Sequence, residues 1–176
     1  MKQLFESERI SFTEVSENLV EDYLIMVNDD EHVNRYIGGY IGGASEPYTR
    51  EQEYEWVRKT LAEKALVYSM IEKSSGDFIG NIEFMDPHDD VAELGIALNA
   101  AKQDMGYGTE AVSAMVDYGF RELGLKRVYL RTNRDNTRAI HVYRKCGFRE
   151  YDRTDKHICM EITRQIPACR DDRRPK

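Results

Sequence analysis

Long hydrophobic runs are missing from this sequence. No apolar stretch approaches the roughly 18 residues that a membrane-spanning helix needs, so no transmembrane helix is predicted. The N-terminal residues, Met1 to Glu6, hold no basic segment that leads into an apolar one, so we expect no secretory signal. These two absences predict a cytoplasmic protein that has no membrane partner.

Cysteine and histidine are also scarce. The three cysteines, Cys146, Cys159 and Cys169, lie far apart and form no C-x-x-C pair. The four histidines show no paired spacing of the kind that metal ligands have. The sequence therefore predicts free thiols and no metal site.

An excess of positive charge is missing as well. Lysine and arginine number 25 against 32 aspartates and glutamates, which gives a formal net charge of -7. Because binding to nucleic acid depends on basic side chains that neutralise phosphates, nucleic acid is disfavoured as a partner. A cationic substrate would be attracted instead.

No stretch rich in proline, glycine or serine divides the chain. Its 176 residues, of which 41% are hydrophobic, suffice to bury one core. We expect one domain over residues 1–166. The charged segment 167–176 is expected to be a disordered tail.

The hydrophobic periodicity alternates between the period of strands and that of helices. Strands are predicted over residues 10–15, 66–70, 78–84, 91–98, 127–132 and 156–162, helices over 19–27, 49–64, 106–123 and 137–145, and a loop over 31–48. The three central strands are joined by short turns and should form an antiparallel meander. The fold class is α+β (mixed α/β).

The most informative segment runs from Gln103 to Thr109, with the sequence QDMGYGT. It follows a predicted strand and opens a predicted helix. Such a turn presents backbone N–H groups and the positive end of a helix dipole to an anion. Gly106 and Gly108 would allow backbone conformations closed to other residues and a close approach of phosphates. The segment predicts a pyrophosphate site.

A dinucleotide site is the alternative for the same segment. Gly106-x-Gly108-x-x-Ala111 also fits the pattern G-x-G-x-x-G/A, which is weak evidence alone. That site needs an acidic residue at the end of the next strand, where this chain has Leu130-Arg131-Thr132. The preceding strands also look antiparallel, so we disfavour this alternative.

Three segments resemble the GCN5-related N-acetyltransferase (GNAT) family. Gln103-x-x-Gly106-x-Gly108 is similar to the family's acetyl-coenzyme A signature, Q/R-x-x-G-x-G/A. Residues 133–148 resemble its N-x-x-N-x-x-A-x-x-x-Y-x-x-x-G-F segment. Residues 92–98 resemble the strand before the signature, particularly in the branch of ribosomal-protein N-terminal and spermidine acetyltransferases. The resemblance implies a central, mostly antiparallel sheet of about six to seven strands flanked by about four helices.

The resemblance also implies acetyl-coenzyme A (acetyl-CoA) as cosubstrate. The backbone around Leu98 and Asn99 would pair with its pantetheine arm, and Tyr143 would protonate the departing thiolate. The residues expected at the coenzyme are Leu98, Asn99, Gln103, Asp104, Met105, Gly106, Tyr107, Gly108, Thr109, Asn136 and Tyr143. Ala100 stands where close relatives often have proline, which matters little to a site built from backbone donors.

The reaction implied is direct attack of a neutral amine on the thioester. An amine whose pKa is near 10 must first lose a proton, and Glu93 is the candidate base. Tyr36, Tyr40, Trp56 and Glu93 are candidates for the acceptor pocket. Structural roles remain open beside these: core packing for Tyr143 and Trp56, hydrogen bonding to backbone for Glu93, and a helix N-cap for Asn136.

The acceptor is a primary amine whose identity stays open. It is either a small cationic amine, such as a polyamine or an aminoglycoside, or a protein N-terminus. A homodimer is compatible with the sequence. The alternative function is a catalytically inactive acetyl-CoA-binding regulatory or interaction module, against which the presence of Tyr143 and Glu93 argues.

Overall fold

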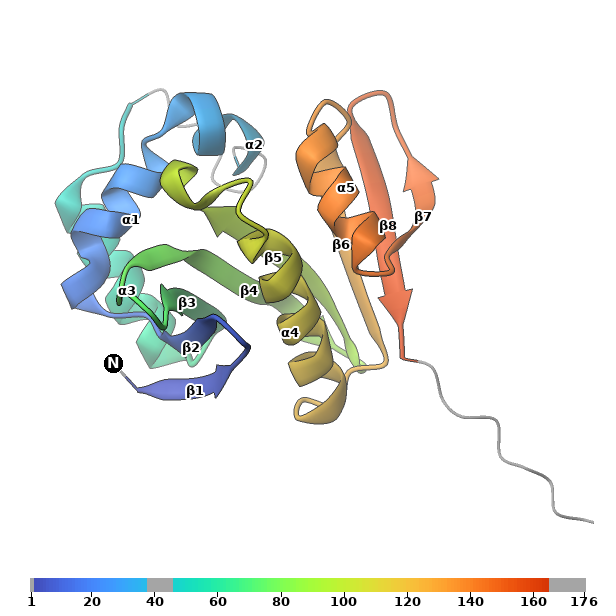
Figure 1. Ribbon diagram of the computed structural model, residues 1–176, viewed down its shortest axis with the longest axis horizontal. Helices are drawn as coiled ribbons and strands as arrows, with labels where there is room; N and C mark the ends of the chain where they lie inside the picture. The colour runs from blue at the N-terminus through green and yellow to red at the C-terminus, as the bar shows by residue number, and fades with distance from the viewer. Residues whose placement is uncertain (1, 38–45, 165–176) are drawn as a thin grey trace, which may run out of the picture.

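The computed structural model describes residues 2–37 and 46–164, and these residues build one eight-stranded sheet flanked by helices (Figure 1). The strands are β1 (Gln3–Glu6), β2 (Ile10–Glu14), β3 (Leu66–Glu72), β4 (Phe78–His88), β5 (Val91–Leu98), β6 (Arg127–Asn133), β7 (Arg149–Arg153) and β8 (His157–Thr163). The α-helices are α1 (Val20–Val27), α2 (Arg35–Ile37), α3 (Arg50–Glu63), α4 (Tyr107–Arg121) and α5 (Thr137–Lys145). Short 3-10 turns cover Glu17–Leu19 and Ala100–Lys102, and a π-helical turn covers Asp30–Asn34.

The sheet has the order β1-β2-β3-β4-β5-β6-β8-β7. Its strands pair antiparallel except for β5 and β6, which run parallel. The mixed, mostly antiparallel architecture is therefore confirmed. The expected strand number of about six to seven is too low, because β1 and β7 were not predicted.

The segment predicted to be a loop over residues 31–48 is helical in its first part. The π-helical turn Asp30–Asn34 continues directly into α2, Arg35–Ile37. The side chain of Asp29 accepts from the backbone N–H of His32 and so caps this turn. The prediction was wrong over residues 31–37, and residues 38–45 lie outside the described part of the chain, as does the predicted tail.

Each strand of the meander sends alternate side chains to opposite faces of the sheet. On one face, Ile82 and Phe84 of β4 pack with buried residues of α4 and α5. On the other face, Ile71 and Phe78 pack with buried residues of α1 and α3. The sheet therefore lies between two helical layers, each with its own apolar core.

The only parallel pair in the described sheet is short. β5 pairs with β6 from Val91 to Glu93, whereas residues 94–98 of β5 have a strand partner only in β4 among the described residues. β6 meanwhile pairs with β8 along its whole length, Arg127 to Asn133. The two strands thus diverge past Glu93, and β5 has an open edge there.

Candidate active site

A cleft of about 1050 Å³ lies where β5 and β6 diverge. Its lining includes Leu98 of β5, Thr132 of β6 and Tyr143 of α5. Residues of α1 and α3 also line it, among them Met26 and Trp56. Because α5 and α3 cover opposite faces of the sheet, the cleft is lined by residues from both faces.

The turn that opens α4 has the geometry of an anion site. Gly106 adopts φ +84° at the N-cap of α4 and supplies no side-chain cap to the helix. Among residues 2–37 and 46–164, none accepts a hydrogen bond from the backbone N–H groups of residues 104–109. Free donors backed by the dipole of a 15-residue helix suit phosphate oxygens.

Only one of the two glycines in this turn needs an unusual backbone. At Gly106 the positive φ is one that L side chains rarely adopt. Gly108 lies inside α4 with an ordinary helical φ, so the expectation of a special conformation there was wrong. A Cβ added at Gly108 would meet Leu98 Cδ1 at 3.4 Å, an ordinary contact.

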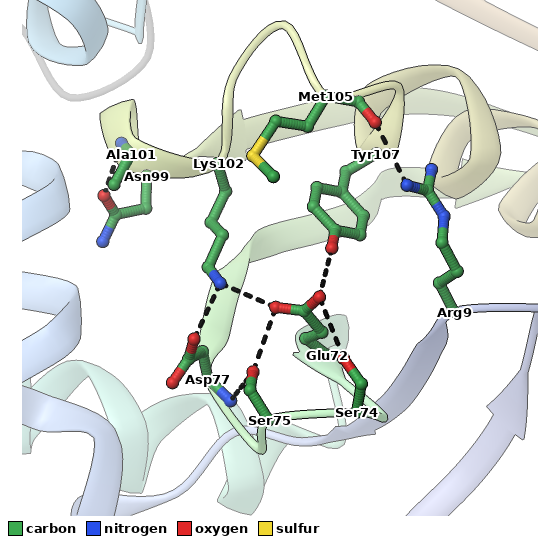
Figure 2. Close-up of polar contacts among 10 residues, drawn as sticks. All are labelled: Arg9, Glu72, Ser74, Ser75, Asp77, Asn99, Ala101, Lys102, Met105 and Tyr107. Carbon is green, nitrogen blue, oxygen red and sulfur yellow. Dashed lines mark hydrogen bonds and ion pairs between the residues drawn. The ribbon is translucent and has the colours of Figure 1, made fainter.

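A polar network holds this turn against the β3–β4 hairpin (Figure 2). Lys102 Nζ donates to Glu72 at 2.7 Å and to Asp77 at 2.8 Å, and the Tyr107 hydroxyl donates to Glu72. Hydrogen bonds from Lys102 and Tyr107 lower the pKa of Glu72 to about 2. Arg9 donates to the Met105 carbonyl oxygen at 3.1 Å. The turn is therefore fixed before any ligand binds.

We call the turn from Gln103 to Thr109 the cradle, and its residues differ in where their side chains point. Gln103, Asp104, Gly106, Gly108 and Thr109 line the cleft, whereas Tyr107 is buried and its hydroxyl binds Glu72. Met105 and Asn99 are not part of the cleft lining. The Asn99 side chain accepts a hydrogen bond from the Ala101 backbone N–H at 3.1 Å. The backbone N–H of Asn99 donates to the carbonyl oxygen of Ile79. Asn99 therefore shapes the turn.

Tyr143 combines a packed ring with a hydroxyl that faces the cleft. It is 7% exposed, lines the cleft, and packs against Phe148 with ring centroids 5.9 Å apart. Among the described residues its hydroxyl has no hydrogen-bond partner. Burial raises the pKa of Tyr143, so the hydroxyl keeps its proton at neutral pH.

Asn136 is the N-cap of α5, as expected. Its Oδ1 accepts from the Ala139 N–H at 3.2 Å. Asn136 also lines the cleft. The cap uses only the oxygen, so the side-chain NH₂ group remains available to a ligand.

Glu93 lies at the point where β5 and β6 part. It is 9% exposed, lines the cleft, and is the last β5 residue paired with β6, opposite Tyr129. Burial, followed by the nearby charge of Glu93, raises the pKa of Tyr129. The two side chains therefore lie near one another at the vertex of the cleft.

Two further carboxylates, not predicted from the sequence, line the same side of the cleft. Glu53 of α3 is 6% exposed, and burial raises its pKa to about 7. Glu83 of β4 is partly buried, and burial together with the charge of Glu93 raises its pKa. The one available sequence signal was the polar alternation of Asn81 and Glu83 along β4.

Three aromatic residues were predicted to line the acceptor pocket: Tyr36, Tyr40 and Trp56. Tyr36 and Trp56 line the cleft on the side of α1 and α3. Trp56 also packs edge-to-face on Tyr23 with ring centroids 5.3 Å apart, so it has a structural role as well. Tyr40 lies outside the described residues.

Acidic and basic side chains are unevenly distributed in the cleft. Glu53, Glu83 and Glu93 come from α3, β4 and β5, whereas Arg138 and Lys145 line the cleft from α5. Arg138 reaches Asp104 of the cradle at 3.5 Å. Arg131 of β6 lies on the face of Glu93 and Tyr129, because it alternates with Leu130, which packs with α4 and α5. Among the described residues no group of three or more His, Cys, Asp or Glu is arranged to hold a metal ion.

A family model described as an acetyltransferase (GNAT) domain matches residues 9–149. This chain belongs to the GNAT family. The GNAT fold and an acetyltransferase activity are thereby shown. No helix among the described residues of this acetyltransferase is long and apolar enough to span a membrane.

The relatives of this GNAT chain include an uncharacterized N-acetyltransferase and a spermidine acetyltransferase. It is 28% identical over 121 residues to an uncharacterized N-acetyltransferase, YnaD, of Bacillus subtilis (strain 168). The match covers 68% of this chain and 68% of that protein. It is 29% identical over 108 residues to a spermidine N(1)-acetyltransferase of Vibrio cholerae, covering 60% of this chain and 62% of that enzyme.

Solved structures share its fold. An acetyltransferase of the GNAT family from Bacillus anthracis has a TM-score of 0.79 at 22% identity and covers 90% of this chain and 96% of its own. The spermidine N-acetyltransferase from Vibrio cholerae in complex with CoA and spermine has a TM-score of 0.73 at 20% identity, covering 89% and 96%. At such identities the likeness establishes the fold alone.

Proposed function

We propose that this GNAT protein transfers the acetyl group of acetyl-CoA to a primary amine of a small, multiply charged cation such as a polyamine. The observation that carries the proposal is the gathering of Glu53, Glu83 and Glu93 on one side of the cleft. An ammonium group is stabilised by such carboxylates, whereas a neutral or anionic acceptor is not. The Vibrio cholerae relative named as a spermidine N(1)-acetyltransferase supports this acceptor class.

The other side of the cleft suits the coenzyme. Backbone N–H groups of residues 104–109 and the cationic side chains Arg138 and Lys145 would hold its phosphates, with Leu98 and Asn136 further along the cleft. Acetyl-CoA supplies the acetyl thioester. The two reactants would thus enter from opposite faces of the sheet and meet where β5 and β6 part.

The side chains of this chain provide the proton transfers that aminolysis of a thioester needs. A carboxylate on the acidic side takes a proton from the bound ammonium group, because only a neutral amine is a nucleophile. Tyr143 donates a proton to the departing sulfur, a role that suits a hydroxyl with a raised pKa facing the cleft. No covalent enzyme intermediate is required.

A thiol-release assay with a panel of amines tests the proposal. We expect spermidine and spermine to be acetylated faster, by kcat/KM, than an aminoglycoside or a peptide with a free N-terminus. Faster acetylation of the peptide would contradict the acceptor class. Release of no thiol with any amine, together with normal acetyl-CoA binding, would instead favour the inactive binding module. The cytoplasmic location and a homodimer stay predictions.

A further inference from the structure

Arg9 contacts the cradle from outside the cleft. It lies in the turn between β1 and β2 and is not part of the cleft lining. Its Nη1 donates to the Met105 carbonyl oxygen at 3.1 Å, as Figure 2 shows. Its guanidinium lies over the Tyr107 ring, 4.4 Å from the centroid, and its Nε donates to Glu110 at 2.7 Å. One side chain therefore binds the cradle and the first turn of α4 together.

The turn between β1 and β2 is itself anchored to α4. Glu110 Oε1 accepts from the Arg9 backbone N–H and from the Ser7 hydroxyl, each at 2.7 Å. The Glu110 side chain is only 16% exposed, and hydrogen bonds to a charged acceptor are stronger than those between neutral groups. The backbone from which the Arg9 side chain extends is therefore fixed relative to α4.

Two neighbours give the guanidinium a defined place. The Tyr107 ring beneath it is 2% exposed, and the Tyr107 hydroxyl is bound to Glu72 on the β3–β4 hairpin. A Cβ added at Gly106 would lie 3.3 Å from Arg9 Nη2. Gly106 thus serves by its small size as well as by its positive φ, because it lets the guanidinium lie close to the backbone of the cradle.

The bond from Arg9 to Met105 sets the direction of one peptide group of the cradle. In a trans peptide the C=O and the following N–H point in opposite directions. Because Arg9 holds the Met105 carbonyl oxygen, the Gly106 N–H points away from Arg9. Asp104 and Gly106 have positive φ, 59° and 84°. Positive φ values so close together gather backbone N–H groups into a concave surface that binds anions.

No other contact holds this peptide group. Glycine accepts φ of either sign, so rotation of the peptide between residues 105 and 106 meets little steric resistance. Within residues 2–37 and 46–164, Arg9 is the only donor to the Met105 carbonyl oxygen, and no acceptor binds the Gly106 N–H. A rotated peptide would present its carbonyl oxygen, which repels phosphate, where the N–H now points. The orientation of the peptide therefore depends on Arg9.

We propose that Arg9 is a positioning residue for acetyl-CoA, which aims the Gly106 N–H at the phosphates by holding the Met105 carbonyl oxygen. This assignment rests on the proposed place of the coenzyme at the cradle. Arg9 acts on the ligand through the backbone. A ligand binds more weakly when the conformation that it needs is only partly populated, so a cradle that Arg9 keeps in one conformation binds more tightly.

The first test measures the Kd of CoA by isothermal titration. Arg9→Met keeps an unbranched stem but removes the guanidinium, and it should weaken binding about tenfold, the loss expected for one hydrogen bond from a charged donor. Lys73→Met is the matched control. Lys73 binds the Ser7 carbonyl oxygen at 2.7 Å and Glu6 at 2.9 Å, and it has no hydrogen bond or ion pair with the cradle in the described part of the chain.

The control should bind CoA within about twofold of the wild type, because it removes a cation from the same corner without touching the cradle. An equal loss in Arg9→Met and Lys73→Met would show a general effect of charge and would overturn the assignment. Wild-type affinity in Arg9→Met would overturn it as well. Melting curves confirm that both variants are folded.

The second test examines the cradle without a ligand. In the coenzyme-free protein, Arg9→Met should produce relaxation dispersion at the Gly106 amide, because the peptide then exchanges between two orientations on the microsecond-to-millisecond timescale. Wild type and Lys73→Met should show none. A residue that only touched a phosphate directly would leave the free protein unchanged. Absence of exchange at Gly106 in Arg9→Met therefore overturns the positioning role.

The third test shortens the donor. S-acetylpantetheine carries the same thioester but lacks the pyrophosphate. Arg9→Met should raise the KM for acetyl-CoA about tenfold, with kcat at saturation within about twofold, and should leave kcat/KM for S-acetylpantetheine unchanged. An equal loss with both donors would overturn the assignment. A wild-type protein that acetylates no amine overturns the proposed function alone, since the titration and the relaxation experiment need no amine.

Discussion

At the scale of single residues, the site is defined by acidic and phenolic groups that burial makes hard to ionise. Glu53 and Tyr143 are both under 10% exposed, and burial raises the pKa of each. For Tyr143 this preserves a proton that can be donated. For Glu53 it creates a carboxyl group that costs stability when charged and gains from a cationic ligand.

Tyr143→Phe should lower kcat by about 100-fold, because it removes the proton donor for the sulfur and keeps the ring that packs on Phe148. A thiolate is already a fair leaving group, so the loss should lie at the lower end of general-acid effects. Steady-state kinetics measures the loss, and a melting curve is the control. An unchanged kcat in a reaction limited by chemistry would exclude the acid role, and a large fall in melting temperature would show a structural one.

Glu53→Gln should stabilise the protein at pH 8 and have little effect on stability at pH 4. The pKa of Glu53 rises from 4.5 to about 7 on folding, so the folded state keeps a proton that the unfolded state loses in this range. Stability therefore falls as pH rises from about 4.5 to 7, by up to ~3 kcal/mol. A neutral glutamine avoids this loss.

The measurement is the melting temperature of Glu53→Gln relative to wild type across this pH range. Glu55→Gln is the matched control, because Glu55 is exposed on the same helix. A stabilisation at pH 8 that equals the one at pH 4 would contradict a titration of Glu53.

At the scale of elements, the turn before α4 and the strands around it explain what the sequence could predict. The turn from Gln103 to Thr109 could be predicted because its glycines, helix start and spacing are all local features. β7 could not be predicted, since all five of its residues are exposed and show no alternation of burial. The side-by-side placement of Glu83 and Gly95 depends on the register of β4 against β5, which no local pattern reveals.

The cradle can be tested with two substitutions at one position. Gly108→Ala should bind acetyl-CoA nearly as wild type does, because the added Cβ makes an ordinary contact with Leu98 at 3.4 Å. Gly108→Asp should abolish binding, because it places a carboxylate in the cleft beside Leu98 and Val142, where its charge repels the phosphates of the coenzyme. Isothermal titration with acetyl-CoA distinguishes them. Normal binding by Gly108→Asp would mean that the phosphates lie elsewhere.

At the scale of the whole molecule, the parting of β5 and β6 creates a site that belongs to both halves of the sheet. The cradle and the acidic groups come from residues before β6, whereas Asn136, Arg138 and Tyr143 come from α5 after it. The direct strand pairing between β5 and β6 extends only from Val91 to Glu93. A ligand that contacts both sides of the cleft therefore adds links that the sheet itself does not provide.

Acetyl-CoA should for this reason raise the melting temperature of the whole domain in a single transition. A ligand that binds only the folded state at 100 times its Kd stabilises it by about 2.7 kcal/mol, which corresponds to roughly 5–11 °C for a chain of this size. Differential scanning fluorimetry measures the shift. Tyr143→Phe should shift as wild type does, since its hydroxyl acts in the reaction, while Gly108→Asp should not shift. Two separate transitions, of which acetyl-CoA moves only one, would show instead that the ligand is held by one half of the cleft alone.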